Sequence, residues 1–264
     1  MRLRPYLRAL QVQTQVTLRY RGNVFAFLSY VLIPPLAVFF LWRAVLGGER
    51  ALGGYDLSTM VTYYIVTQYF VANTAFSAWT DIGEEIRDGR LTLWLLRPAS
   101  HYGLYFARNI GGWIPYWIAG LLGAAAVAGI LHRYFLLPQE PWRIPMAVGF
   151  WLLGVVLAFT WGYILNLLSF WTERSTGIVL MADAAAVFLA GGFVPLDILP
   201  LKEIWLLLPF RFAGWFPTQI YLGRVGFAEL PRELGLLLGW LLTFLVLQKL
   251  IWRLGLRRYQ GAGG

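Results

Sequence analysis

Six long apolar stretches run through the sequence and restrict it to a membrane fold. A helix that crosses a bilayer needs roughly 20 mostly apolar residues, because each residue rises about 1.5 Å and the hydrocarbon layer is about 30 Å thick. Of the 264 residues, 59% are apolar and only 13% are charged, which leaves too few polar groups to cover a water-soluble surface. We therefore expect an all-α membrane protein with one transmembrane domain over residues 1–264. Its six spans are expected at residues 24–46, 58–80, 109–131, 146–171, 177–195 and 235–252.

The positions of the basic residues predict how these spans are oriented. If the N-terminus lies inside the cell, the inner segments hold most of the 22 Lys and Arg residues, as cytoplasmic segments usually do. Both termini, including the tail 253–264, are thus predicted to be cytoplasmic in a multi-pass protein of the cell (inner) membrane. The first apolar run is too long for a signal peptide and no small-residue cleavage site follows it, so we expect it to remain as the first span.

The segment before the first span, residues 1–23, has an amphipathic pattern. As a helix it carries one narrow polar stripe on an otherwise apolar surface, which is typical of a helix lying along the cytoplasmic interface. The stripe consists of Arg4, Arg8, Gln11, Gln15 and Arg19. Both an anchor that merely follows the charge rule and a specific docking element are compatible with this pattern.

The connection between the second and third spans, residues 81–100, is unusually dense in charge. Its pattern predicts a short helix that Gly89 ends in a left-handed turn. Such an ordered, charged helix is unnecessary in a simple linker and favours docking into a cleft on a soluble partner; a solvated amphipathic loop is the alternative. The candidate contact residues are Ile82, Glu84, Glu85, Ile86, Arg87 and Asp88.

The outer segment 196–234 is apolar but interrupted by prolines. Its pieces between Pro200, Pro209, Pro217 and Pro231 are too short to cross the bilayer, so we expect them to dip in and return or to lie on the outer face. Irregular backbone at membrane depth persists only where it is buried in protein or lines a wet cavity. This segment is therefore a candidate for the outer gate of a path.

One carboxylate, Asp183, falls inside a predicted span. Ionisable groups inside a membrane are costly and often mark an ion or substrate pathway. Asp183 lies near the inner end of its span, however, where contact with cytoplasmic water or pairing with Arg174 accounts for it as well.

Several chemistries lack the residues that they need. The absence of cysteine excludes thiolate chemistry, and only two histidines argue against a metal site. Neither Lys202 nor Lys249 follows a glycine, so the chain has no phosphate-binding loop of the kind that holds ATP. We expect no enzymatic activity and no bound cofactor. Nucleic-acid binding is not expected either, because the basic residues are scattered between the apolar runs.

Three segments in this order resemble the permease subunits of type 2 ABC transporters, and the similarity covers nearly the whole chain. The loop EEIRDGRLTLWLLRP, Glu84 to Pro98, resembles the cytoplasmic loop of that family. The stretches GGFVPLDILP, Gly191 to Pro200, and LLLPF, Leu206 to Phe210, resemble its outer segment.

The resemblance implies an exporter-like permease that works with other chains. The charged helix would be the coupling helix, seated in a separate ATPase that binds ATP and Mg²⁺. Two ATPase copies would serve two permeases, this chain paired with itself or with a paralogue, surrounded by membrane lipids. The path between them would be lined by residues of the second and fifth spans, and its composition favours a lipid-like, drug-like or otherwise amphipathic cargo. The candidate path-lining residues are Tyr64, Gln68, Asn73, Asp183 and Phe188.

Two further functions remain compatible with the sequence. One is an ion-coupled secondary transporter or channel that uses Asp183, and the other is a membrane scaffold without cargo.

Overall fold

The computed structural model describes residues 3–46, 51–74, 81–172 and 175–259. In these residues the regular structure is helical, apart from an isolated bridge between Leu52 and Tyr55. Four helices of this part are long and apolar enough to cross a membrane. They are α2 (Arg21–Leu46), α6 (His101–Ile130), α7 (Arg143–Leu167), which the short helix η1 (Leu168–Phe170) continues, and α11 (Leu230–Arg258).

The other two predicted spans correspond to shorter helices. Helix α3 (Leu57–Ala72) covers the start of the predicted span 58–80, whose residues 75–80 lie outside the described part. Helix α8 (Ser175–Leu189) ends before the predicted boundary of span 177–195, because Gly191 turns the chain with a φ of +81°. The six-span arrangement therefore stays a prediction. An all-helical fold with four helices of crossing length is what the described residues show.

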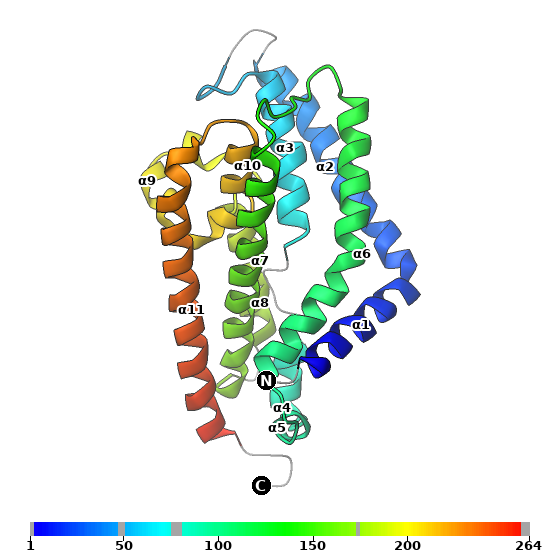
Figure 1. Ribbon diagram of the computed structural model, residues 1–264, viewed down its shortest axis with the longest axis vertical. Coiled ribbons are helices and arrows are strands. Elements are labelled where there is room, and N and C mark those ends of the chain that lie inside the picture. The colour runs from blue at the N-terminus through cyan, green and yellow to red at the C-terminus, as the bar shows by residue number, and fades with distance from the viewer. Residues whose placement is uncertain (1–2, 47–50, 75–80, 173–174, 260–264) are drawn as a thin grey trace.

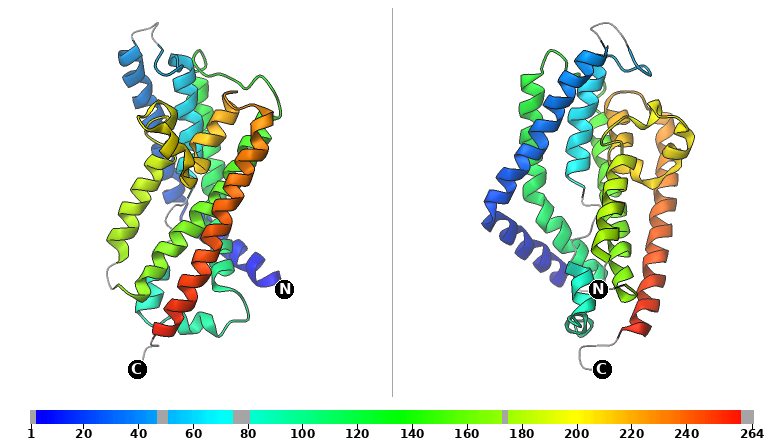
Figure 2. Two further views of the ribbon diagram at one scale, coloured as in Figure 1. Left: turned by 90° about the vertical axis from the view of Figure 1, so that its left-hand side faces the viewer. Right: turned by 180° about the vertical axis from the view of Figure 1, so that it is seen from behind.

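The helices stand in two groups. Helices α2, α3 and α6 lie on one side and α7, α8 and α11 on the other, as the opposite views of Figures 1 and 2 show. The short helices η3 (Pro209–Ala213) and α10 (Trp215–Tyr221) join the groups by packing against α7, and α10 also contacts α3. At Gly154 of α7 a Cβ atom would lie 2.4 Å from the carbonyl oxygen of Phe212, so only glycine allows this approach. The two groups meet in an aromatic core that includes Phe150, Trp151 and Phe216.

The N-terminal helix α1 (Arg4–Arg19) crosses the first half of α6 at an angle (Figure 1). Gly111 of α6 allows the contact, since a Cβ atom there would lie 2.2 Å from the carbonyl oxygen of Leu10. The Thr14 hydroxyl donates a hydrogen bond of 2.8 Å to the carbonyl oxygen of Gly111. The predicted polar stripe of α1 is exposed along its length. The helix itself is as predicted, and its place at a membrane interface stays a prediction.

The outer segment returns to the helix bundle. It contains η2 (Leu196–Ile198), α9 (Lys202–Leu207), η3, α10 and η4 (Phe227–Glu229). All residues from 209 to 220 are buried. The hydroxyl groups of Thr67 in α3 and Thr218 in α10 are hydrogen-bonded at 2.8 Å. This irregular backbone is thus covered by protein, the condition under which a membrane tolerates it.

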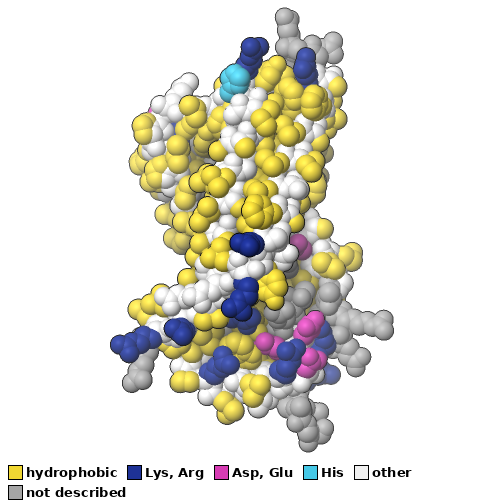
Figure 3. All heavy atoms as spheres, turned by 90° about the vertical axis from the view of Figure 1, so that its right-hand side faces the viewer, with side chains coloured by type: hydrophobic (Ala, Val, Ile, Leu, Met, Phe, Trp, Pro, Cys, Tyr) yellow, Lys and Arg dark blue, Asp and Glu magenta, His cyan; other side chains and the backbone are white. Residues whose placement is uncertain are grey.

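Charged and apolar side chains occupy different parts of the surface. On the face shown in Figure 3, hydrophobic side chains cover the long middle region, and most charged side chains gather at the lower end. Helix α1, helices α4 and α5 of the charged loop, and the carboxyl end of α11 lie toward that same end (Figure 1). The surface has the character of a lipid-facing belt above one strongly charged, water-facing end.

Candidate functional site

The charged loop forms two short helices at the charged end of the molecule. They are α4 (Asp81–Arg87) and α5 (Leu91–Leu95), joined by a turn in which Gly89 has a φ of +72°. This is the left-handed turn that the sequence predicts. Both helices project at the end of the bundle (Figures 1 and 2), where a second protein can reach them.

The inner face of this segment is buried in the chain itself. Ile82 has no exposed surface, and Ile86 and Leu91 are also buried, in a cluster with Phe159 and Tyr163 of α7. Burying three such side chains stabilises the segment by several kcal/mol, about 1.5–3 kcal/mol each. Helices α4 and α5 are therefore packed stably against the helix bundle.

Polar contacts hold α4 and α5 to the ends of two long helices. The Arg87 guanidinium donates to the Ser169 hydroxyl of η1 at 3.4 Å. The Tyr259 hydroxyl, just beyond α11, donates to the carbonyl oxygen of Gly89 at 2.6 Å and accepts from the backbone NH of Thr92 at 3.2 Å. These hydrogen bonds connect α4 and α5 directly to the ends of α7 and α11.

The outer face of the segment mixes charges with exposed leucines. We call it the docking face and define it as Glu84, Asp88, Arg90, Leu93 and Leu96, all exposed. Asp88 and Arg90 form an exposed ion pair at 2.9 Å. The Leu93 and Leu96 side chains are 64% and 79% exposed. Large apolar side chains among charges, at a protein end that faces water, are typical of a contact surface for a second protein.

The structure divides the six predicted contact residues into two groups. Glu84 and Asp88 belong to the docking face, and Arg87 is half-buried. Ile82, Glu85 and Ile86 lie inside the chain. Leu93 and Leu96 are not among the six predicted contact residues, although they belong to the loop motif EEIRDGRLTLWLLRP. Contact of these residues with a partner stays a prediction.

The predicted path-lining residues of α3 lie among the helices of this chain. The Tyr64 hydroxyl donates to the carbonyl oxygen of Phe193, and the Gln68 amide donates to that of Tyr30 in α2 at 3.3 Å. Asn73 is only 1% exposed and caps the end of α3 against Gly120 of α6. These three side chains tie α3 to its neighbours.

The two candidates of α8 are more accessible than Tyr64 and Asn73. Phe188 is 37% exposed and Asp183 is half-buried, with a partner of its own. Arg174, the predicted partner, lies outside the described residues. That the five candidates line a path between two chains stays a prediction.

A hydrogen-bonded network that the sequence patterns did not predict lies at the opposite end of the molecule. Asp197 of η2 accepts hydrogen bonds of 2.9 Å from the Tyr55 hydroxyl and from the Trp215 indole. The Gln219 amide donates to the Tyr55 hydroxyl at 2.8 Å, and the Arg224 guanidinium lies 3.8 Å from the centre of the Tyr55 ring. Burial, and next the Asp197 carboxylate, raise the pKa of Tyr55, so its hydroxyl remains a donor at physiological pH. The network joins the loop before α3 to the outer segment.

Comparison with known proteins identifies the family. A search of curated proteins gives no match. A family model described as "ABC-2 family transporter protein" matches residues 32–263, most of the chain, from α2 through the outer segment and α11. This family consists of membrane permeases, generally non-catalytic, that associate with an ABC ATPase. The chain therefore belongs to the ABC-2 transporter family and is a multi-pass membrane permease.

Proposed function

We propose that this chain forms the translocation path of an ATP-driven exporter and receives its driving motion through the docking face. The observation that carries the proposal is the two-sided segment α4–α5. Its inner face is fixed to α7 and α11, and its outer face presents Leu93, Leu96 and exposed charges at the end of the molecule. A partner that moves this segment moves the two helix ends with it, as rigid packed elements do.

The proposed assembly contains two permeases and two ATPase subunits. ATP and Mg²⁺ bind in the ATPases, and this chain supplies no catalytic residue. The second permease is another copy of this chain or a paralogue, and the path runs between the two. In this arrangement the more accessible α8 residues, Asp183 and Phe188, are better placed to face the path than Tyr64 or Asn73, which are buried within the chain.

The proposed cargo is lipid-like, drug-like or otherwise amphipathic. A cavity of about 410 Å³ between α3, α6 and α7 supports this class, since its walls are almost entirely apolar and include Tyr69, Ala124 and Phe135. A cavity of this kind holds an apolar chain or ring more readily than a hydrated ion.

The proposed orientation places the docking face in the cytoplasm of the cell membrane. Helix α1 and the carboxyl end of α11 lie toward the same end of the molecule, and the cytoplasm supplies the ATP that a soluble ATPase binds. The predicted excess of basic residues in the inner segments supports this orientation.

Affinity purification of the tagged chain from its native membrane tests the proposal. We expect a soluble ATPase with a phosphate-binding loop to remain bound in stoichiometric amount, with or without a second permease. A chain that purifies without any ATPase, even after cross-linking, would refute the proposed assembly.

A further inference from the structure

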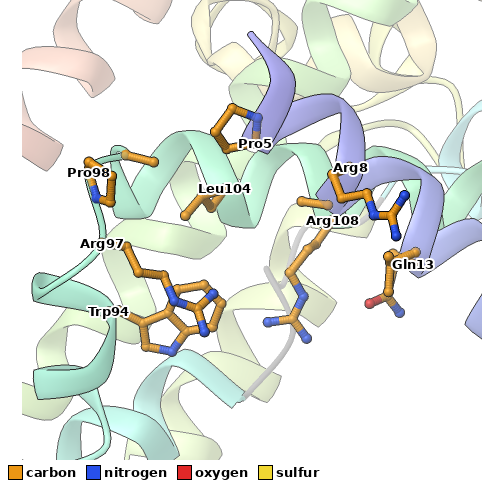
Figure 4. Close-up of a pocket in the computed structure, with 11 residues that line it drawn as sticks. Pro5, Arg8, Gln13, Trp94, Arg97, Pro98, Leu104 and Arg108 are labelled. Carbon is orange, nitrogen blue, oxygen red and sulfur yellow. The ribbon is translucent and has the colours of Figure 1, made fainter. Parts of the chain in front are cut away.

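A basic pocket lies between α1 and the start of α6, beside the segment that follows α5. The cavity has a volume of about 400 Å³. Three arginines from three different elements line it (Figure 4): Arg8 from α1, Arg97 from the segment after α5, and Arg108 from α6. The chain thus brings three positive charges to one small cavity, although Arg8 and Arg108 are far apart in the sequence.

No acidic side chain neutralises these charges within the described part of the chain. The ion pairs found there join Arg90, Arg143, Arg211 and Arg224 to carboxylates, and none includes a pocket arginine. The Arg97 guanidinium lies 4.0 Å from the centre of the Trp94 ring, and that of Arg108 lies 5.0 Å from the centre of the Tyr105 ring. The aromatic rings position the guanidinium groups without neutralising their charge. The like charges of the three arginines therefore repel one another until an anion binds between them.

Apart from the amide of Gln13, the remaining walls of the pocket are apolar. Pro5, Ala9 and Val12 of α1 face Leu104 of α6 across it. A small inorganic anion would contact only the arginines, whereas an amphipathic anion contacts both the arginines and the apolar walls. Exposed apolar side chains on α1, among them Leu3 and Leu7, are typical of a helix at a membrane surface, the predicted position of α1 on which this inference rests.

We propose that this pocket binds the phosphate-bearing headgroup of an anionic membrane lipid. The guanidinium groups of Arg8, Arg97 and Arg108 hold the phosphate, as forked donors suit phosphate oxygens. The glycerol backbone and the first methylenes lie along Pro5, Ala9 and Val12. Basic pockets between membrane helices on the cytoplasmic side recognise such headgroups. The bound lipid contacts α1, α6 and the segment after α5. It thereby stabilises the position of α4 and α5 relative to α1.

Native mass spectrometry of the purified full chain tests this inference without any ATPase, so its outcome is separate from that of the proposed function. The protein is titrated in detergent with phosphatidylglycerol, with phosphatidylcholine of the same acyl chains, and with inorganic phosphate. We expect one phosphatidylglycerol to bind more tightly than the others and to remain bound. Binding of phosphatidylcholine or inorganic phosphate with equal affinity would overturn the assignment to an anionic lipid.

Variants separate the pocket from general surface charge. Arg8→Gln and Arg97→Gln should each weaken phosphatidylglycerol binding about tenfold, because each loses a charge-assisted contact. Arg8 is exposed, and among the described residues the cation–ring contacts at the pocket involve Arg97 and Arg108, so we expect Arg8→Gln to leave the fold intact even if Arg97→Gln disturbs Trp94. Arg4→Gln removes the same charge from the exposed stripe of α1, outside the pocket, and should leave binding unchanged. Equal loss in Arg4→Gln and Arg8→Gln, or no loss in either pocket variant, would overturn the proposal.

Discussion

The close contact between α1 and α6 requires a glycine at position 111. The loss of stability in Gly111→Ala measures how much this contact contributes. The added Cβ atom would lie 2.2 Å from the carbonyl oxygen of Leu10, so α1 must move away by about 1 Å or more before the atoms reach ordinary contact. That movement also breaks the 2.8 Å hydrogen bond from Thr14 to Gly111. Overpacking costs about 1–3 kcal/mol and the lost hydrogen bond about 1 kcal/mol. We therefore expect Gly111→Ala to lower the free energy of unfolding by about 2–4 kcal/mol.

Gly129→Ala is the matched control for this prediction. Gly129 lies on the same helix, and a Cβ atom there would meet no atom within 4 Å. This change should be neutral or stabilising by up to about 1 kcal/mol, because alanine is the better helix former. Reversible unfolding of the purified variants, followed by circular dichroism, gives both values. Equal stabilities of Gly111→Ala and Gly129→Ala would refute the reasoning that glycine holds α1 against α6.

Three further predictions concern the outer network, Asp183 and the orientation. Asp197→Asn should lower the unfolding free energy by about 1–3 kcal/mol, because two hydrogen bonds lose their charged acceptor; denaturant unfolding measures the loss, and an unchanged midpoint would contradict it. Asp183→Asn should leave ATP-driven transport within about twofold of the native rate; dependence of transport on that carboxylate and on an ion gradient would instead support ion coupling. The chain has no cysteine, so Leu96→Cys and Leu137→Cys each provide a single label site. An impermeant thiol reagent should reach Leu137→Cys from outside intact cells and Leu96→Cys only after lysis, and the reverse pattern would invert the proposed orientation.

Hydropathy predicted the helical membrane fold because the apolar runs are local in sequence. The spacing of the polar stripe located α1, and the glycine after the charged run located the turn at Gly89. Helix α8 ends at Leu189 although the apolar composition continues through Gly191, because tertiary contacts turn the chain there: the backbone NH of Trp215 donates to the carbonyl oxygen of Ala190 at 2.7 Å. Hydropathy averaged over neighbouring residues contains no information about a contact between residues far apart in the sequence.

The charged loop was located from the sequence, but its inner and outer faces were not. The alternation of charges and isoleucines indicates an amphipathic helix, yet it leaves open whether Ile82 and Ile86 meet a partner or the same chain. The structure shows that they pack on α7. The network of Tyr55, Asp197 and Gln219 was missed for a related reason, since each residue is ordinary in its local segment and only the fold brings the three together.

The docking face is the central claim, and a binding measurement on paired leucine variants tests it most directly. Leu96 on the docking face and Leu137 at the opposite end are exposed to nearly the same extent, 79% and 77%. Leu96→Asp, combined with Leu93→Asp, should weaken binding of the co-purified ATPase at least about tenfold, because it removes apolar contact and introduces charges that the interface must desolvate. Leu137→Asp should leave that affinity unchanged. ATPase binding that survives the docking-face change, or that is lost equally with Leu137→Asp, would contradict the claim that this permease is driven through α4 and α5.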